Sequence, residues 1–239
     1  MPVRKTLTNN EIYHVIIRGV ADMPIFKNDQ DRYRAIFSLY EFNNVNPVVM
    51  RERRGHRKRV KNIKIDRGPS SVNFEKRDLF VEILSFCFMP NHIHLLLKQI
   101  KDNGITQFMR KLGTGYAGYF NKKHGRKGYL FQGRFKSTHI QNERQLRVVF
   151  SYIHTNPISL IDPGWKEEGI RNLGKIIKFL ENYNWSSYGD YLGKDNFPSI
   201  TDRQFLLEVM QGADGCKNFI DDWLKYKKSL KNNYKINIE

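Results

Sequence analysis

Short hydrophobic stretches, bounded by turn residues, predict the strands of this chain. Ile12–Arg18 is rich in β-branched and aromatic residues and stops at a glycine, which is typical of a strand. Three further stretches show similar β character: Leu79–Phe88, His92–Gln99 and Arg134–Ile140. The turn Met89-Pro90-Asn91 separates the second strand from the third, so these two are predicted to form an antiparallel hairpin.

Hydrophobic residues at helical spacing predict three main helices, over Asp29–Tyr40, Thr106–Lys123 and Asn142–Thr155. Asn28 and Asn142 are of the residue types that cap helix N-termini, and Asn156-Pro157 is expected to end the third helix. The second helix carries glycines at 113, 115 and 118, which weaken it or permit close packing.

The predicted order is strand, helix, strand, strand, helix, strand, followed by one more helix. This order indicates an α+β fold with a ferredoxin-like (RRM-like) antiparallel sheet and packed helices. We expect residues 1–160 to form this domain, with a basic insertion at about 51–78. Residues 161–239 are expected to form a mostly helical extension, with short helices around 175–180, 202–210 and 217–230.

The composition is that of a globular, basic protein. Hydrophobic residues make up 40% of the 239 positions, which excludes a disordered chain. Lys and Arg number 41 against 24 Asp and Glu, a net charge of +17. The window 51–67 holds nine basic and two acidic residues, hence +7 of that charge, so the bias is not confined to it. Such a charge favours a polyanionic partner, although it also serves solubility.

Two features bear on the cellular setting. The two cysteines, Cys87 and Cys216, form no disulfide framework and no zinc-binding pattern, and Cys87 is expected to be a buried small side chain. The N-terminus lacks the apolar stretch of a signal peptide, and no segment approaches 18 consecutive apolar residues. We therefore expect a soluble, cytoplasmic protein without a membrane partner.

The third predicted strand carries a pair of histidines. Alternate residues of a strand share a face, so His92, His94 and Leu96 point one way, and two imidazoles at this spacing can bind one cation. Leu96 implies that this face is partly covered by another element. Taken alone, a His-x-His pattern is a weak signal, since many strands carry hydrogen-bonded or surface histidines.

The helix Asn142–Thr155 carries the residues that strengthen this signal. Tyr152 and Asn156 lie one turn apart at the border of its apolar stripe, where side chains can reach over a sheet face. Asn156 can supply an oxygen ligand, and Tyr152 would then stand one turn from the cation. His154 falls on the polar side of this helix and is expected to be solvated. Tyr116 and Tyr119 follow the apolar stripe of their own helix and are expected to be packing residues rather than site residues.

The combination of motifs resembles the single-tyrosine (His-hydrophobic-His) transposases, and within them the branch associated with repetitive extragenic palindromes. The resemblance spans about residues 10 to 193. It rests mainly on three ordered segments: Met89-Pro90-Asn91-His92-Ile93-His94-Leu95-Leu96-Leu97, then Gly128-Tyr129-Leu130-Phe131-Gln132-Gly133-Arg134-Phe135-Lys136-Ser137, then Tyr152-Ile153-His154-Thr155-Asn156-Pro157. Tyr13-His14-Val15 with Arg18-Gly19, and Asn184-Trp185-Ser186-Ser187-Tyr188, also fit.

This resemblance implies a nuclease in which Tyr152 attacks single-stranded DNA next to a hairpin. It implies that His92, His94 and Asn156 hold Mg²⁺ or Mn²⁺. The insertion-sequence members usually have Gln where Asn156 stands, whereas the palindrome-associated branch has Asn. The resemblance to this longer branch favours a site built within one chain, although a homodimer that exchanges the tyrosine helix stays open beside the monomer.

The expected mechanism follows from phosphodiester chemistry. A tyrosine phenol is a weak nucleophile at neutral pH, and a bound cation would offset charge in the transition state. The product would be a 5′-phosphotyrosine and a free 3′-hydroxyl, so the site could rejoin strands. Stacking surfaces are expected at Tyr129 or Phe131. Candidate DNA-binding residues are Arg18, Arg110, Lys111, Arg126, Lys127, Gln132, Arg134 and Lys136.

Two other functions stay open. A protein of this fold could bind structured DNA or RNA without cutting it, but it would need neither the histidines nor Tyr152 and Asn156. A plasmid replication or conjugation nickase with the same chemistry is disfavoured by the short chain and the lack of a helicase segment.

Overall fold

The computed structural model describes residues 6–47 and 77–236, with side chains up to residue 229. The predicted basic insertion at 51–78 lies outside these residues, except for its last two. The strands are β1 (Ile12–Arg18), β2 (Val81–Met89), β3 (His92–Gln99) and β4 (Lys136–His139). The helices of the sheet domain are α1 (Asp29–Phe42), α3 (Gly104–Lys123) and α4 (Glu143–Thr155).

The four strands form one antiparallel sheet in the order β2-β3-β1-β4. This is the ferredoxin-like arrangement expected from the order of strands and helices, so the predicted fold class is confirmed. The register pairs His94 with Ile16 of β1 and with Cys87 of β2. Opposite residues of an antiparallel pair share a face, so this register decides which side chains surround the histidines.

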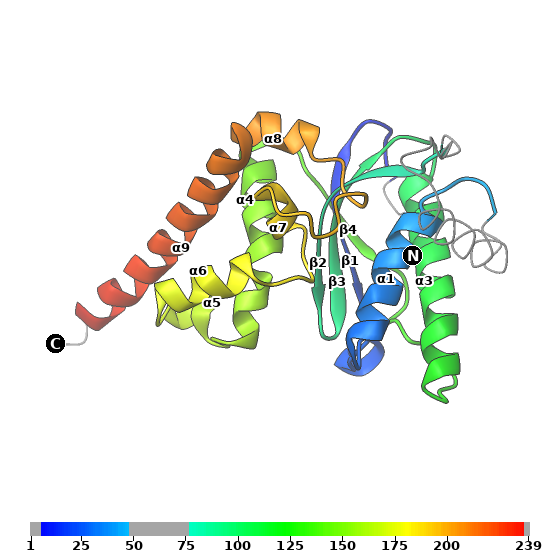
Figure 1. Ribbon diagram of the computed structural model, residues 1–239, viewed down its shortest axis with the longest axis horizontal. Helices are drawn as coiled ribbons and strands as arrows, with labels where there is room; N and C mark the ends of the chain where they lie inside the picture. The colour runs from blue at the N-terminus through cyan, green and yellow to red at the C-terminus, as the bar shows by residue number, and fades with distance from the viewer. Residues whose placement is uncertain (1–5, 48–76, 237–239) are drawn as a thin grey trace, which may run out of the picture.

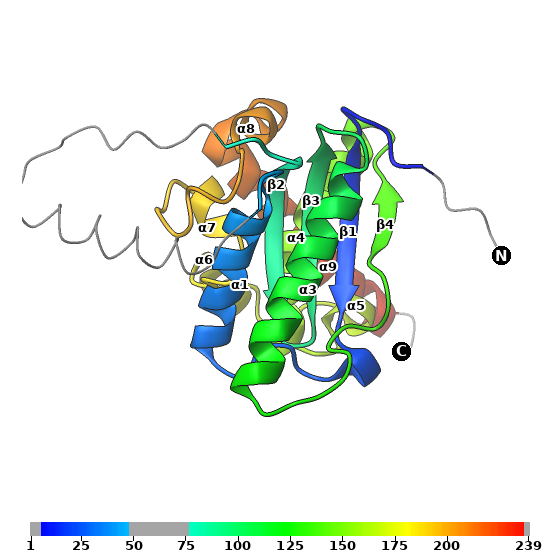
Figure 2. The ribbon, with the colours of Figure 1, turned by 90° about the vertical axis from the view of Figure 1, so that its right-hand side faces the viewer.

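Each face of the sheet is covered by helices (Figures 1 and 2). α1 and α3 lie side by side on one face, and α4 crosses the other. The first face buries an apolar core that includes Val15, Ile93 and Leu95. Close packing of α1 and α3 explains one glycine of the second helix, because a Cβ on Gly115 would lie 2.4 Å from the Phe42 ring.

The chain beyond α4 folds into short helices and one long one. These are η2 (Asn156–Leu160), α5 (Trp165–Glu168), α6 (Leu173–Glu181), α7 (Tyr188–Tyr191), α8 (Gln204–Met210) and α9 (Gly212–Ile236). They share a second core with α4 and with the histidine-bearing face of the sheet. Leu96 and Cys87 lie fully buried in this core. The boundary at residue 160 stays a prediction, while the helical character of the extension is confirmed.

The predicted caps of two helices are present. Asn28 Oδ1 accepts a hydrogen bond from the backbone N–H of Asp31, and Asn142 Oδ1 accepts one from Gln145. Each satisfies an N–H group that the first turn of a helix leaves without a partner. In the part of the chain that the structure describes, no helix combines the length and apolarity needed to span a lipid bilayer.

Candidate functional site

The histidine pair lies at the start of β3, on the face that α4 crosses. The rings of His92 and His94 have centroids 4.7 Å apart at an angle of 77°. His94 is 2% exposed, and His92 is half-buried. Between them Ile93 points to the opposite face and is buried in the first core, so it anchors the strand that carries both histidines.

Each histidine has one ring nitrogen hydrogen-bonded and one without a hydrogen bond to any described residue. Nδ1 of His92 lies 2.6 Å from Oδ1 of Asn91, and Nδ1 of His94 lies 2.9 Å from Nε2 of His14. Nε2 of His94 is buried and has no hydrogen-bond partner. A buried polar nitrogen without a partner is costly, which makes this atom a candidate ligand for a cation.

Both histidines are neutral at pH 7. Burial lowers the pKa of His92 to about 4, and the nearby charges of Arg18 and Lys166 lower it further than burial alone would. Burial also holds the pKa of His94 well below its usual value, with smaller effects from His92 and His14. A neutral imidazole keeps the lone pair that metal binding requires.

Tyr152 lies on α4 against the histidines. Its ring centroid lies 5.6 Å from that of His94 and 5.7 Å from that of His14, edge-on to both rings. The apolar side of α4, including Phe150 and Ile153, is buried in the second core and fixes the rotation of the helix. The structure therefore brings Tyr152 and the histidine pair together within one chain.

Asn156 follows Tyr152 by one turn and is 5% exposed. Its Nδ2 donates a hydrogen bond of 2.7 Å to the backbone carbonyl of Tyr152, which ties the amide to the end of α4. Its Oδ1 accepts a longer hydrogen bond of 3.5 Å from Nζ of Lys166. The amide oxygen is thus not bonded to the helix backbone, and its described partner is the ammonium group of Lys166.

The donor set suits a divalent cation. Two neutral imidazoles with an amide oxygen form a mixed set that Mg²⁺ or Mn²⁺ can use when water and phosphate oxygens complete the shell. A cation site would also give Nε2 of His94 a partner, since this buried nitrogen has no hydrogen-bond partner. Among the described residues, no group of three or more His, Cys, Asp and Glu side chains is arranged to hold a metal. The ligand roles therefore stay a prediction.

Two residues that were not predicted site residues, His14 and Lys166, also lie in this site; the segment Tyr13-His14-Val15 fits the resemblance, but no role was expected for His14. Alternation along Ile12–Arg18 places His14 on one face, but only the register of β1 against β3 puts it beside His94. Lys166 lies on α5, and its Nζ is 5.0 Å from the centroid of the Tyr152 ring. No sequence signal indicates Lys166, because it reaches the site through the fold of the C-terminal extension.

The predicted DNA-binding residues divide between the two faces of the sheet. Arg18 pairs with His92 across β1 and β3, and Lys136 pairs with Ile16, so both share the face of the histidines. Arg110 and Lys111 lie on α3, which covers the opposite face. Lys111 donates to the backbone carbonyls of two asparagines, Asn44 and Asn46. The fold therefore separates Arg110 and Lys111 from the histidine site.

The other four predicted residues, Arg126, Lys127, Gln132 and Arg134, belong to the loop between α3 and β4. This loop docks on the end of β1, because the N–H of Gln132 donates to the carbonyl of Arg18 and the N–H of Val20 donates to the carbonyl of Leu130. Within it Tyr129 is 88% exposed, whereas Phe131 is 8% exposed and packed in the first core. Of the two predicted stacking aromatics, Tyr129 is the one that presents a free ring.

The predictions for Tyr116 and His154 have different outcomes. Tyr116 is buried, as expected, and its hydroxyl donates to the carbonyl of Ile25. The expectation that His154 is solvated is wrong, because its side chain is 0% exposed and its Nε2 lies 2.9 Å from Oγ of Ser187. The helices beyond α4 cover the polar side of α4, and the sequence of α4 alone does not reveal that.

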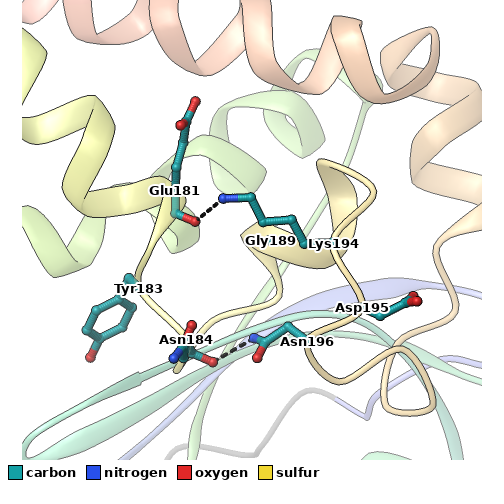
Figure 3. A pocket seen from close by; sticks show the side chains of 7 residues that line it. All are labelled: Glu181, Tyr183, Asn184, Gly189, Lys194, Asp195 and Asn196. Atoms are coloured by element: carbon teal, nitrogen blue, oxygen red, sulfur yellow. Dashed lines mark hydrogen bonds between the residues drawn. The ribbon is translucent and has the colours of Figure 1, made fainter.

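A surface hollow lies away from this chemistry, between α6 and the chain around α7 (Figure 3). It is lined by Glu181, Tyr183, Asn184, Gly189, Lys194, Asp195 and Asn196. Lys194 and Asn196 are engaged across it by backbone carbonyls of Glu181 and Asn184. None of these seven residues is a predicted site residue, and the hollow has no part in the function argued below.

The sequence matches the model of a known protein family. Residues 53–156 match the sequence model of the family described as "Transposase IS200 like". The matched segment is a little under half of the chain, and it contains His92, His94, Tyr152 and Asn156. The resemblance to the single-tyrosine transposases is thus confirmed. A search of curated proteins found no match.

Solved structures show more distant similarity. A structure described as a REP-associated tyrosine transposase bound to a REP hairpin has 16% identity and a TM-score of 0.47, over 85% of this chain and 95% of that one. A bacterial tRNA(His) guanylyltransferase (Thg1)-like protein in complex with ATP has 11% identity and a TM-score of 0.37, over 75% and 72%.

Proposed function

We propose that this chain, which matches the IS200-like transposases over its central segment, is a metal-dependent single-stranded DNA endonuclease and strand transferase that cuts next to DNA hairpins. The observation that supports the proposal is the position of Tyr152. Its ring centroid lies 5.6 Å from that of His94, on the sheet face that also carries His92. The nucleophile Tyr152, followed one turn later by the amide of Asn156, and the pair of neutral histidines come from two separate parts of the sequence, α4 with its C-terminal end and β3.

The chemical step is a transesterification. The Tyr152 oxygen attacks the phosphorus of a phosphodiester, the bond from phosphorus to the 3′ oxygen breaks, and the phenol loses its proton. The leaving 3′ oxygen takes up a proton, and the DNA 5′ phosphate stays linked to Tyr152. Reversal of the same step by a 3′-hydroxyl rejoins strands without an added energy source.

The chain's own residues would prepare this step in three ways. His92, His94 and Asn156 would hold Mg²⁺ or Mn²⁺, which supplies charge to polarise a phosphate oxygen when it is bound. Arg18 and Lys136, on the same face, would bind phosphates on either side of the cut. Lys166, with Nζ 5.0 Å from the centroid of the Tyr152 ring, would add a positive charge beside the nucleophile.

The substrate follows from the charge, the exposed aromatic and the family match. A net charge of +17 favours a nucleic acid, and an exposed tyrosine on a basic loop can stack on an unpaired base. A hairpin with an adjacent single strand offers a duplex backbone to bind, unpaired bases to stack on, and single-stranded phosphodiester bonds to cut. The proposed protein is cytoplasmic and acts as a monomer or a homodimer, and the proximity of Tyr152 to His94 within one chain supports the monomer.

The test uses purified protein, a labelled hairpin oligonucleotide with single-stranded flanks, and Mg²⁺ or Mn²⁺. We expect an adduct that survives SDS, and we expect Tyr152→Phe to abolish it. The matched control is Tyr226→Phe, at an exposed tyrosine on α9, which should form the adduct normally. An adduct that persists in Tyr152→Phe would show that the nucleophile is another residue.

A second variant separates chemistry from binding. His92→Ala should bind the hairpin as the wild type does and form no adduct. If the wild type itself binds the hairpin tightly and forms no adduct with any divalent metal, the protein is a structured-DNA binding protein of this fold rather than a nuclease.

A further inference from the structure

His94 makes its one side-chain hydrogen bond to another histidine. Nε2 of His14 lies 2.9 Å from Nδ1 of His94, and the two rings stack with centroids 5.1 Å apart at an angle of 14°. Both side chains are buried, at 8% and 2% exposure. They are diagonal neighbours on β1 and β3, because His14 pairs with Leu96 and His94 pairs with Ile16.

A hydrogen bond between two neutral imidazoles has two possible directions. Each ring carries one N–H and one lone pair, so either His94 donates from Nδ1 to His14, or His14 donates from Nε2 to His94. Burial lowers the pKa of His14 to about 4, so His14 is neutral at pH 7. The direction of this bond decides the state of Nε2 of His94. Nε2 has a free lone pair in the first case and carries a hydrogen in the second.

The surroundings of Nε2 favour the lone pair. This nitrogen is buried and has no acceptor to receive a hydrogen. A buried N–H without an acceptor loses its hydrogen bond to water and gains nothing in return. The first direction avoids that loss only if something else satisfies the lone pair, and a cation would do so.

The neighbouring histidine repeats the arrangement. Nδ1 of His92 faces Oδ1 of Asn91, an amide oxygen that can only accept, so Nδ1 carries the hydrogen and Nε2 carries the lone pair. The amide of Asn91 is itself oriented, because its Nδ2 donates to Oδ1 of Asp22. Both histidines thus have their Nδ1 atoms held by neighbouring side chains, and neither Nε2 atom is hydrogen-bonded to another residue that the structure describes.

We propose that His14 is a positioning residue, which accepts a hydrogen bond from Nδ1 of His94 and so keeps the lone pair of His94 on Nε2. Partners of this kind fix the tautomer and ring orientation of ligand histidines, and their loss typically weakens metal binding by about 10- to 100-fold. The role as a support for a metal ligand rests on the proposed function. The tautomer itself is a property of the metal-free protein.

Two substitutions separate the hydrogen bond from packing. His14→Phe keeps a ring of similar shape against His94 and Tyr152 but offers no acceptor. His14→Gln loses the ring but carries an amide oxygen that can accept from Nδ1 of His94. A role in packing alone would favour Phe over Gln, whereas the proposed role predicts the reverse.

The experiment reads the His94 tautomer by long-range ¹H–¹⁵N NMR of the metal-free protein at pH 7.5. We expect the hydrogen on Nδ1 in the wild type and in His14→Gln, and a shift towards Nε2 in His14→Phe. Titration with Mn²⁺, followed by electron paramagnetic resonance, should show binding about 10- to 100-fold weaker in His14→Phe and close to wild type in His14→Gln.

The possible outcomes are distinct. A wild-type spectrum with the hydrogen on Nε2 of His94 overturns the proposal, and so does an unchanged tautomer in His14→Phe. If His14→Phe does not fold, His14→Leu takes its place, and the wild-type spectrum remains decisive. If the tautomers are as proposed but the wild type binds no Mn²⁺, the assignment to His14 stands and the metal part of the proposed function is overturned.

Discussion

Nζ of Lys166 lies 3.5 Å from Oδ1 of Asn156, so a residue of the C-terminal extension reaches the end of the tyrosine helix. The same ammonium group lies 5.0 Å from the centroid of the Tyr152 ring. Trp165 beside it is 2% exposed and packs in the second core, which anchors α5 against the site. The extension therefore supplies a charge to the site as well as a cover for the sheet.

Replacement of Lys166 by Met should slow adduct formation by roughly 10- to 100-fold, because it removes a positive charge from the place where negative charge develops. Single-turnover assays with the hairpin oligonucleotide would measure this. Lys178→Met removes an exposed lysine from α6 and is the matched control, expected to keep the wild-type rate. Equal rates for the two variants would remove Lys166 from the mechanism.

Tyr129 is predicted to stack on an unpaired base. Tyr129→Ala should weaken binding of a hairpin with single-stranded flanks by about 1 kcal/mol or more, since a base–aromatic stack contributes about 1–3 kcal/mol. Tyr129→Trp should bind as the wild type does. Fluorescence anisotropy would measure the affinities, with Tyr226→Ala as an exposed control. If Tyr129→Ala weakens binding of a blunt hairpin without single-stranded flanks as much as binding of the flanked one, Tyr129 does not stack on an unpaired base.

His154 should make the fold sensitive to acid. Burial lowers its pKa from 6.5 to about 3 in the folded protein, so between these values the unfolded chain binds a proton that the folded chain does not. The contribution is fully present above pH 6.5 and is lost progressively as the pH falls towards 3. Once below pH 6.5, the free energy of unfolding should fall by about 1.4 kcal/mol per pH unit from this group.

The matched variant is His154→Gln, which does not titrate and can still bond to Ser187. Urea denaturation at pH 7.5 and 5.5 should show a loss about 1.4 kcal/mol larger in the wild type than in the variant. The other buried histidines are present in both proteins and cancel in the difference. Parallel pH profiles would mean that His154 is protonated in the folded state.

Gly19 should not tolerate a side chain. A Cβ there would lie 2.4 Å from the backbone oxygen of Met23 and 3.0 Å from Ile25 Cγ2, so the turn that carries Asp22 would have to move. We expect Gly19→Ala to lower the free energy of unfolding by about 1–3 kcal/mol in urea denaturation. Gly118→Ala is the control, because its Cβ would meet nothing within 4 Å and alanine favours the helix. A Gly19→Ala protein as stable as the control would contradict the predicted clash.

Much of the site could be predicted because the side chains of a strand or a helix follow a regular period along the sequence. The period of a strand puts His92, His94 and Leu96 on one face, and the buried Leu96 shows that this face is covered. The period of a helix puts Tyr152 and Asn156 one turn apart. These relations hold within one element, so they can be read from the chain without knowing what packs against it.

The tertiary structure alone decided which other side chains complete the site. The register of β1 against β3 brings His14 to His94, and a shift of one residue would have turned His14 to the opposite face. The path of the extension brings Lys166 to Asn156 and buries His154. The sequence by itself determined the elements and the faces of the four predicted residues. Register and long-range packing depend on contacts between distant segments, and no local period encodes them.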